Sequence, residues 1–281
     1  MVLQHTDCGA QQYVLRLQAP RTAARATPGS FVHLRCSDDL PMRRPLSIMR
    51  ADPAAGWIEV LYKVVGTGTA ALAQQAVGAQ LNLLGPIGQG FKPDPARPRV
   101  LAIGGGVGIP PMVFLAHSLL SDQRANWKPL VLMGSEIPFP FRTRPSHILV
   151  PGVPDGTIAC MPMLDEWGIP SRLASLAGYA GCYSGYVTQL AEHWLNSLSA
   201  SERSEVALYA CGPTAMLEAV ARVAATHALP CQVSLEEFMA CAVGGCAGCA
   251  VEVHTPQGRA MKRVCVDGPV FEAAAVFHRT Q

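Results

Sequence analysis

The feature that most constrains this chain is a set of four cysteines near its C-terminus: Cys241, Cys246, Cys249 and Cys265. Their spacing is C-x4-C-x2-C followed after fifteen residues by the fourth, which is the spacing of a plant-type [2Fe–2S] cluster. Only alanine, valine and glycine separate the first three cysteines, so the backbone can wrap tightly and direct its amides at sulfur. The alternatives are a structural zinc site or buried free thiols, but zinc favours two short-spaced pairs and the chain has one C-x2-C. The spacing therefore predicts an iron–sulfur cluster.

The segment after Cys249 predicts how the thiols come together. Residues 250–255 alternate, 256–258 resemble a turn, and 259–264 return, which together predict a β-hairpin. With Gln257 at its centre, Cys249 and Cys265 lie opposite each other with Cβ atoms about 5 Å apart. These two thiolates can then share one iron, which leaves the other two cysteines for the second iron.

Size and composition limit the class of protein. The 281 residues suffice for two ordinary domains and a small module, and the 49% hydrophobic content supports real cores. The formal charge is only +2, and the charged residues, 15% of the chain, do not form a basic stripe. Nucleic acid is therefore not expected as a partner. Ten scattered cysteines and a low-potential cluster suit a reducing cytoplasm.

Neither a signal peptide nor a membrane span is expected. The first residues lack the charged and apolar regions of a signal peptide. Residues 100–121 contain no Lys, Arg, Asp or Glu and have about the length of a span, but glycine and proline crowd their first half. This stretch instead predicts a strand, a phosphate loop and a helix.

The N-terminal region predicts an antiparallel β-barrel. Short apolar or alternating segments, separated by turn residues, occupy residues 13–17, 31–36 and 57–65. A proline-rich stretch, residues 91–98, has the composition of an interdomain linker. We therefore expect the first domain to comprise residues 1–97.

The middle of the chain predicts a doubly wound parallel α/β domain over residues 98–230. Strands are expected at 100–103, 129–133 and 206–210, and helices at 112–120 and 214–227. Residues 231–281 then form the cluster module, and the sequence Ser234-Leu235-Glu236-Glu237 predicts a capping box for a short helix before Cys241.

Two glycine-containing motifs follow predicted strands. Gly104, Gly105, Gly106 and Gly108 precede Pro110 and Pro111, so backbone amides can approach a pyrophosphate at a helix N-terminus. The alternative is a tight structural turn. Cys211, Gly212 and Pro213 follow residues 206–210 and so lie at the carboxyl edge of the sheet, where ligands bind. The alternative there is an ordinary turn with a buried thiol.

Two weaker motifs lie in the first domain. An arginine within Arg43-Arg44-Pro45-Leu46-Ser47 can clamp a phosphate, and the serine can hydrogen-bond a flavin ring nitrogen. The segment Gly66-Thr67-Gly68-Thr69 adds amides and hydroxyls. Taken singly, the alternatives are an exposed basic turn and a plain loop.

The order of these motifs resembles the ferredoxin–NADP reductase superfamily, in which an FAD-binding barrel precedes a nicotinamide-binding domain. Two segments narrow this resemblance to one family within the superfamily. They are Ser234-Leu235-Glu236-Glu237-Phe238-Met239-Ala240-Cys241 and Lys262-Arg263-Val264-Cys265-Val266-Asp267-Gly268-Pro269-Val270-Phe271. They are similar to the electron-transfer subunits of type B, NAD-dependent dihydroorotate dehydrogenases. The similarity extends over nearly the whole chain.

The resemblance implies roles for particular residues. The flavin is implied to lie against Arg44, Pro45, Leu46, Ser47, Leu61, Tyr62, Lys63, Gly68 and Thr69. The nicotinamide dinucleotide is implied to contact Gly105, Gly106, Gly108, Cys211, Gly212 and Pro213, with Ser47 and Cys211 as the catalytic residues. The four cysteines match the cluster ligands. Many reductases of the superfamily carry tyrosine where Leu46 stands, so ring stacking on the flavin must come from elsewhere or be absent.

The pyridine nucleotide pocket departs most from the family pattern. Residues 135–185 are longer than the resemblance implies. Glu136, near the end of the second strand, disfavours a 2′-phosphate, whereas Arg142 and Arg144 are close enough in sequence to reach one. We therefore expect NAD, with NADP as the alternative.

The chemistry implied is electron transfer in a complex. A hydride carries two electrons whereas a [2Fe–2S] cluster takes one, and a flavin can convert between the two. The resemblance implies a partner subunit that contains FMN and oxidises dihydroorotate in pyrimidine biosynthesis, in a heterotetramer. Phe238, Val270 and Phe271 are candidates for contacts with this partner, and ordinary core packing is the alternative.

Other functions use the same parts. The alternatives are the reductase of a transhydrogenase, hydrogenase or oxygenase system, or a non-catalytic redox sensor. Only 51 residues follow Pro230, too few for the C-terminal ferredoxin of an oxygenase reductase.

Overall fold

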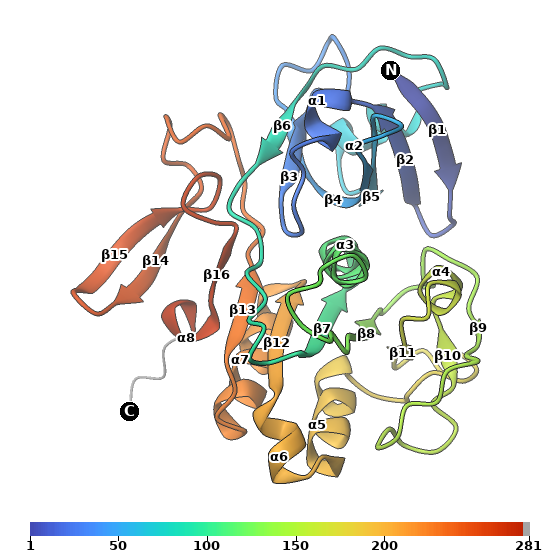
Figure 1. Cartoon of the computed structure of the whole chain (residues 1–281). Helices are drawn as coiled ribbons and strands as arrows, with labels where there is room; N and C mark the ends of the chain where they lie inside the picture. The colour runs from blue at the N-terminus through green and yellow to red at the C-terminus, as the bar shows by residue number, and fades with distance from the viewer. Residues whose placement is uncertain (278–281) are drawn as a thin grey trace.

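The computed structural model describes residues 1–277, which form an upper β-barrel, a lower α/β domain and a lateral hairpin (Figure 1). The barrel has six antiparallel strands in the order β1-β2-β5-β4-β3-β6. They are β1 (Val2–Asp7), β2 (Gln12–Gln18), β3 (Phe31–Leu34), β4 (Arg44–Asp52), β5 (Trp57–Lys63) and β6 (Leu83–Ile87), with the short helices α1 (Pro20–Ala23) and α2 (Thr67–Ala73). Alternate residues of all the strands enclose one apolar core, for example Leu15, Val32 and Val60.

The second sheet has the order β11-β8-β7-β12-β13-β16, and its first five strands are parallel. The strands are β7 (Arg99–Gly105), β8 (Leu130–Gly134), β11 (Ser171–Ala174), β12 (Val206–Cys211), β13 (Cys231–Ser234) and the antiparallel β16 (Val270–Glu272). Leu101 and Ile103 pack with helices α5 (Val187–Ser197) and α7 (Thr214–Thr226), whereas Val100 and Ala102 pack with helix α3 (Ile109–Leu119). The sheet is therefore covered on both faces, as a doubly wound fold requires.

Helix α3 lies between the barrel and the parallel sheet (Figure 1). Met49 of β4 and Leu61 of β5 belong to the same buried cluster as Met112 and Val113 of α3. Because each such side chain contributes about 1.5–3 kcal/mol when fully buried, this shared core fixes the two domains relative to each other. The helix has eleven residues, and no helix within the described residues is long and apolar enough to cross a membrane.

The long connection over residues 135–185 folds onto the sheet. It contains β9 (Arg144–Pro145), β10 (Ala159–Cys160) and α4 (Pro162–Glu166), and β9 pairs with β10. The side chain of Gln12 in the barrel donates a hydrogen bond to the carbonyl of Pro138, at 2.8 Å. The connection thus contacts both domains. Two short segments complete the α/β domain: the turn η1 (Gly106–Gly108) and helix α6 (Ala200–Ser204).

The predicted linker is packed rather than free. The ring of Phe91 meets the ring of Tyr209 edge to face, with centroids 5.8 Å apart. The amide of Lys92 donates to the side-chain oxygen of Gln232, at 2.9 Å. The stretch therefore follows the second sheet before entering it at β7.

The cluster region, residues 235–269, connects two neighbouring strands of the second sheet. It leaves at the end of β13, forms the hairpin of β14 (Ala250–Thr255) and β15 (Gly258–Arg263), and returns in β16, after which α8 (Ala273–Val276) follows. The division into 1–97, 98–230 and 231–281 stays a prediction, and β13 and β16, within the third range, are strands of the second sheet.

Two local predictions for this region are wrong. No helix follows Ser234: its backbone pairs with Cys211 and Val270, and the amide of Leu235 donates to the carbonyl of Pro269, so the chain stays extended. The hairpin centre lies between Pro256 and Gln257, because Thr255 pairs with Gly258. A two-residue turn replaces the longer one expected.

Candidate cofactor site

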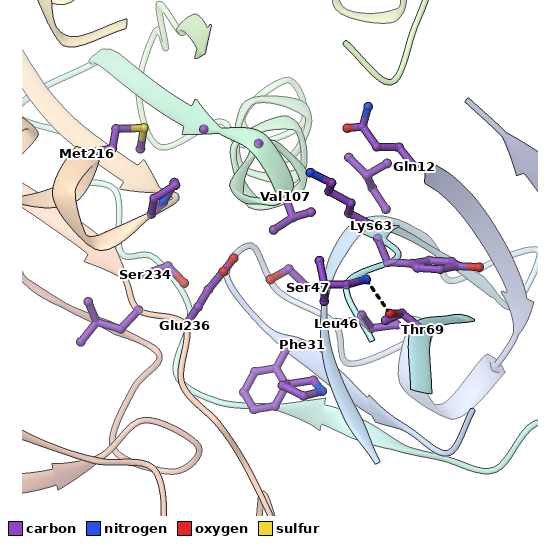
Figure 2. A pocket seen from close by; sticks show the side chains of 18 of the residues that line it. Gln12, Phe31, Leu46, Ser47, Lys63, Thr69, Val107, Met216, Ser234 and Glu236 are labelled. Atoms are coloured by element: carbon purple, nitrogen blue, oxygen red, sulfur yellow. Dashed lines mark hydrogen bonds between the residues drawn. The ribbon is translucent and has the colours of Figure 1, made fainter. Parts of the chain in front are cut away.

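One cavity of about 1300 Å³ lies where the barrel, the parallel sheet and the cluster region meet. Figure 2 shows its lining from close by, with Ser47 from the barrel, Val107 from the glycine loop and Glu236 from the segment before the cysteines around the same space. The lining includes most of the residues predicted to contact cofactors: Arg44, Pro45, Leu46, Ser47, Leu61, Tyr62, Lys63, Thr69, Gly105, Gly106 and Pro213. The predicted residues that do not line it are Gly68, Gly108, Cys211 and Gly212.

The barrel end of the cavity is cationic. Arg43, Arg44 and Lys63 all line it. A guanidinium nitrogen of Arg44 donates to the carbonyls of Met42 and Arg43, at 2.9 and 3.1 Å. Gly68 lies behind this guanidinium, and a Cβ atom at Gly68 would collide with it. The glycine therefore leaves room for Arg44, which suits a phosphate ligand.

Thr69 orders the loop beside Arg44. Its hydroxyl oxygen accepts from the amides of Val65 and Gly66, at 3.0 and 3.3 Å, and donates to the carbonyl of Gly66, at 3.1 Å. These bonds hold the start of α2 against the cavity. Of the second segment predicted to contact the flavin, Gly66 and Thr69 line the cavity. Gly68 does not line it and leaves room for the Arg44 side chain.

The glycine loop connects β7 to α3. Gly105 and Gly106 line the cavity, and Gly106 has φ +54°, a left-handed conformation that favours glycine. Gly108 instead packs against the carbonyl of Cys211. Pro110 and Pro111 begin the helix, where no amide donor is lost. The loop therefore presents free backbone to the cavity, as expected for a pyrophosphate site.

Cys211 lies behind the cavity wall rather than in it. Its side chain is fully buried, and Pro213 and Met216 form the wall in front. Burial, assisted by the carboxyl of Glu236, holds the pKa of the Cys211 thiol well above its usual range. A neutral thiol at this place can pack and donate a weak hydrogen bond, but it is not a ready nucleophile.

Glu236 is a candidate functional residue that the sequence did not reveal. Its carboxyl lies 4.0 Å from the Cys211 sulfur, and Figure 2 shows it pointing to the same part of the cavity as the Ser47 hydroxyl. The side chain of Glu236 is exposed toward the cavity, yet protein surrounds most of the carboxyl, and this desolvation raises its pKa. The sequence predicts that Glu236 belongs to a helix cap. The one sequence signal for a role in ligand binding is its position just after a strand that ends at the ligand-binding edge of the sheet.

The segment that carries the four cysteines, residues 241–265 and here called the cysteine loop, directs backbone amides at sulfur. The amide of Val243 donates to the sulfur of Cys241, at 3.5 Å, and that of Gly248 donates to the sulfur of Cys246, at 3.4 Å. In each case the residue in between is an alanine with positive φ, Ala242 at +55° or Ala247 at +54°. The same turn therefore occurs twice, and its backbone strain is typical of a functional site.

The four thiols form two pairs. The amide of Val243 and the neighbouring thiol of Cys246 lower the pKa of Cys241 to about 6. Burial and the adjacent thiol of Cys249 raise the pKa of Cys265 to about 11. Although the hairpin register places Cys249 opposite Val264, Cys265 follows directly, and its thiol still reaches Cys249.

This pairing matches the donor set of a two-iron cluster. Each iron of a [2Fe–2S] centre needs two thiolates, and each pair supplies two. Within residues 1–277, no three His, Cys, Asp or Glu side chains gather as a single metal ion would require. The two thiol pairs therefore fit the donor set of a [2Fe–2S] cluster.

Comparison with known proteins agrees with this arrangement. Residues 236–277 match the family model for the iron–sulfur cluster binding domain of dihydroorotate dehydrogenase B. The chain is 32% identical over 280 residues to the dihydroorotate dehydrogenase B (NAD(+)) electron transfer subunit of Shouchella clausii, covering 98% of this chain and 96% of that one. The chain belongs to the family of dihydroorotate dehydrogenase B electron transfer subunits. The same subunit of Bacillus caldolyticus is 35% identical over 271 residues, covering 94% of this chain and 92% of that one.

Solved structures share the fold of this chain. The structure of an NADH-dependent reduced ferredoxin–NADP oxidoreductase has a TM-score of 0.77 at 24% identity, covering 98% of this chain and 88% of that one. A ferredoxin NADP+ reductase from Neisseria gonorrhoeae has a TM-score of 0.59 at 17% identity, covering 80% and 89%. The predicted fold class, a flavin-type barrel, a parallel α/β domain and a cluster module, is confirmed.

The carboxyl end of β8 contributes one acidic side chain to the cavity. Glu136 follows β8 and lines the cavity. Arg144 does not line it and instead pairs with Asp165 and Glu166, at 3.5 and 3.3 Å. Arg142 is exposed outside the lining. Neither arginine lines the cavity.

Proposed function

We propose that this chain transfers electrons between a catalytic partner subunit and NAD, through a [2Fe–2S] cluster and FAD. Family membership supports the class of reaction, an oxidoreductase component of the dihydroorotate dehydrogenase B type. In the proposed direction, dihydroorotate loses two electrons and two protons to become orotate. NAD+ accepts both electrons and one proton as a hydride, and the second proton goes to solvent.

The observation that carries the proposal is the composition of the cavity wall. Arg44 and Ser47 of the barrel, Gly106 of the glycine loop and Gly248 of the cysteine loop line one continuous space. A flavin held by the first pair would lie between a dinucleotide on the glycine loop and a cluster on the cysteines. Bound FAD would supply the conversion between single electrons and a hydride.

We propose distinct roles for three side chains near the centre of the cavity. The Ser47 hydroxyl would hold a hydrogen bond to the reactive edge of the flavin ring. Glu236, whose pKa desolvation raises above its ordinary value, would present its carboxyl beside that ring. Cys211 would act through position, because its neutral, buried thiol packs behind Pro213 and next to Glu236.

The partner is proposed to dock on the cluster region. Phe238 is 93% exposed beside the cavity, and Val243 and Met261 are also exposed. Val270 and Phe271 instead pack against the buried clusters, which supports the core interpretation for these two. We infer that the partner is an FMN-containing subunit that oxidises dihydroorotate, and that two copies of each chain form a heterotetramer.

A reducing, cytoplasmic location is part of the same proposal. All ten cysteines are free thiols in the structure. Disulfides are rare in reducing compartments, where the pairs at the cysteine loop would remain available to iron.

Reconstitution of the complex tests the proposed function. The chain, purified anaerobically with FAD and iron, is used to capture its partner from native extract, and the captured protein is then purified. We expect NADH alone to bleach the flavin of the isolated chain and dihydroorotate to leave it oxidised. Addition of the captured FMN subunit should restore NAD+ reduction by dihydroorotate. Capture of a dehydrogenase with another substrate would contradict the assignment, and failure of NADH to bleach the flavin would favour a redox sensor.

A further inference from the structure

The two thiol pairs of the cysteine loop differ in burial. Cys246 is exposed and Cys241 is half-buried, so these two form an outer pair. Cys249 and Cys265 are buried and form an inner pair. None of the cysteines, all of which lie within residues 1–277, is part of the cavity lining. The side chains between the cavity and the inner pair therefore decide whether water in the cavity reaches those two thiols.

Two apolar side chains separate the cavity from the inner pair. Phe31 of β3 and Met239 of the cluster region both line the cavity, and Phe31 is labelled in Figure 2. Both also belong to the apolar core that contains Cys249 and Cys265, and they are only 4% and 8% exposed. Within the described residues, no other buried side chain belongs to both the lining and this core. Phe31 and Met239 thus form a partition, with the cavity on one side and the inner pair on the other.

The barrel fixes the ring of Phe31 at this place. Phe31 pairs with Ser47 across β3 and β4, so the two side chains lie on the same face of the barrel sheet. A Cβ atom at Gly88 would come within 3.3 Å of the Phe31 ring. The next amide, that of Gln89, donates to the carbonyl of Gly268, at 2.5 Å. The barrel therefore contacts the chain that follows the last cysteine right beside this ring.

An apolar partition matters to an iron–sulfur cluster because reduction adds a negative charge. A cluster held by thiolates is already anionic, and water stabilises additional charge better than apolar side chains do. Solvent exposure is one of the factors that set the reduction potential of such a cluster. A dry inner pair therefore favours a low potential, at which a reduced cluster readily gives its electron to a flavin.

We propose that Phe31 and Met239 hold the cluster at a low reduction potential by keeping the water of the cavity away from Cys249 and Cys265. This inference rests on the proposed function, because it concerns the cluster and the flavin assigned there. Both are positioning residues, since each acts through the solvent that it excludes. Together they bias the single electron toward the flavin, and so toward NAD+.

Redox titration of the FAD- and iron-loaded chain tests this inference. The reduced cluster is followed by its electron paramagnetic resonance signal and the flavin by its absorbance, so one sample gives both midpoint potentials. Phe31→Ala and Met239→Ala each shorten one side of the partition, and each should shift the cluster potential to a more positive value. Phe31→Leu keeps an apolar side chain there and should stay closer to the wild type. In heavy water, the cluster signal of both alanine variants should gain coupling to exchangeable deuterons, which loss of stability alone would not produce.

A matched control separates this effect from general weakening of the core. Phe114 of α3 is 7% exposed and packs in the barrel core, but it neither lines the cavity nor contacts the inner pair. Phe114→Ala should therefore destabilise the chain and leave the cluster potential unchanged. Met239 lies outside the barrel, so Met239→Ala decides the question if Phe31→Ala does not fold.

Two results would overturn the inference and leave the proposed function intact. One is an unchanged cluster potential in the alanine variants that retain iron, and the other is an equal shift in Phe114→Ala. A wild-type chain that holds no cluster or no FAD would overturn both the inference and the proposed function.

Discussion

The loop that carries the four cysteines occupies residues 241–265, whereas the cavity beside it is lined by residues from Gln12 to Pro269. The loop depends on local conformation: two alanines with positive φ turn two amides toward sulfur. The cavity depends on the packing of the barrel, α3 and the parallel sheet around a shared core. Apart from Gly248, which belongs to both, a substitution in the loop should therefore damage the cluster site alone, and a substitution in the cavity lining should change ligand binding without touching the cysteines.

The largest effect is expected from Cys265→Ser. This change removes one thiol of the Cys249–Cys265 pair, and loss of one ligand of four should abolish stable binding of the cluster. Iron content should fall from about two per chain to near zero, while the FAD content and NADH-dependent bleaching of the flavin persist. Cys182→Ser, at a cysteine outside the loop, is the control and should keep its iron. Loss of FAD together with iron would show that the two sites are not separable.

An intermediate effect is expected from Arg44→Ala. The guanidinium, held against Gly68 and two backbone carbonyls, is the proposed clamp for the flavin pyrophosphate. Loss of charged hydrogen bonds worth about 1.5–3 kcal/mol should weaken FAD binding by roughly ten- to a hundredfold. Fluorescence titration of the apoprotein with FAD measures this. Arg21→Ala, on the barrel surface, is the control. If Arg44→Ala retained FAD but lost iron, the assignment of Arg44 to the flavin site would be wrong.

The smallest effect is expected from Glu236→Gln, read as stability against pH. Desolvation raises the pKa of Glu236 above its ordinary value of 4.5, so the folded chain holds this proton more tightly than the unfolded chain. The resulting stabilisation is present below pH 4.5 and is lost as the pH rises through the raised value. Because water reaches the carboxyl through the cavity, we expect no more than about 1 kcal/mol, or about 2–4 °C in Tm.

The measurement is Tm of the FAD-loaded protein from pH 4.5 to pH 8. The wild type should lose more Tm over this range than Glu236→Gln. The neighbouring Glu237→Gln serves as the control, since Glu237 is exposed. Parallel profiles for the wild type and Glu236→Gln would show that the carboxyl is not desolvated.

Sequence predicts the parts of this molecule that are local. Residues 206–210 and 214–227 were expected as a strand and a helix and are found as β12 and α7, because buried apolar runs and helical periodicity are properties of short segments. The cysteine spacing predicts a two-iron donor set for the same reason. The paired thiols agree with it even though the hairpin centre is displaced.

Sequence is weaker where contacts join distant residues. Glu236 belongs to a plausible capping box, but cross-strand bonds from Ser234 to Cys211 and Val270 keep the segment extended and turn the carboxyl into the cavity. Gly68 and Gly108 were assigned to ligands, yet they make room for Arg44 and for the carbonyl of Cys211. These outcomes depend on tertiary packing, which local propensity does not encode.

The excursion from β13 to β16 begins and ends on adjacent strands of one sheet. Strands that pair lie about 4.8 Å apart, so the cysteine loop is anchored at two points that cannot separate without breaking the sheet edge. Such a double anchor leaves no single hinge about which the loop could swing. A ligand that joins Cys241 to Cys265 would also act as a cross-link across this excursion, restricting the unfolded chain as a disulfide does. Loading with iron should then stabilise the edge of the second sheet formed by β13 and β16, in addition to supplying the cluster for electron transfer.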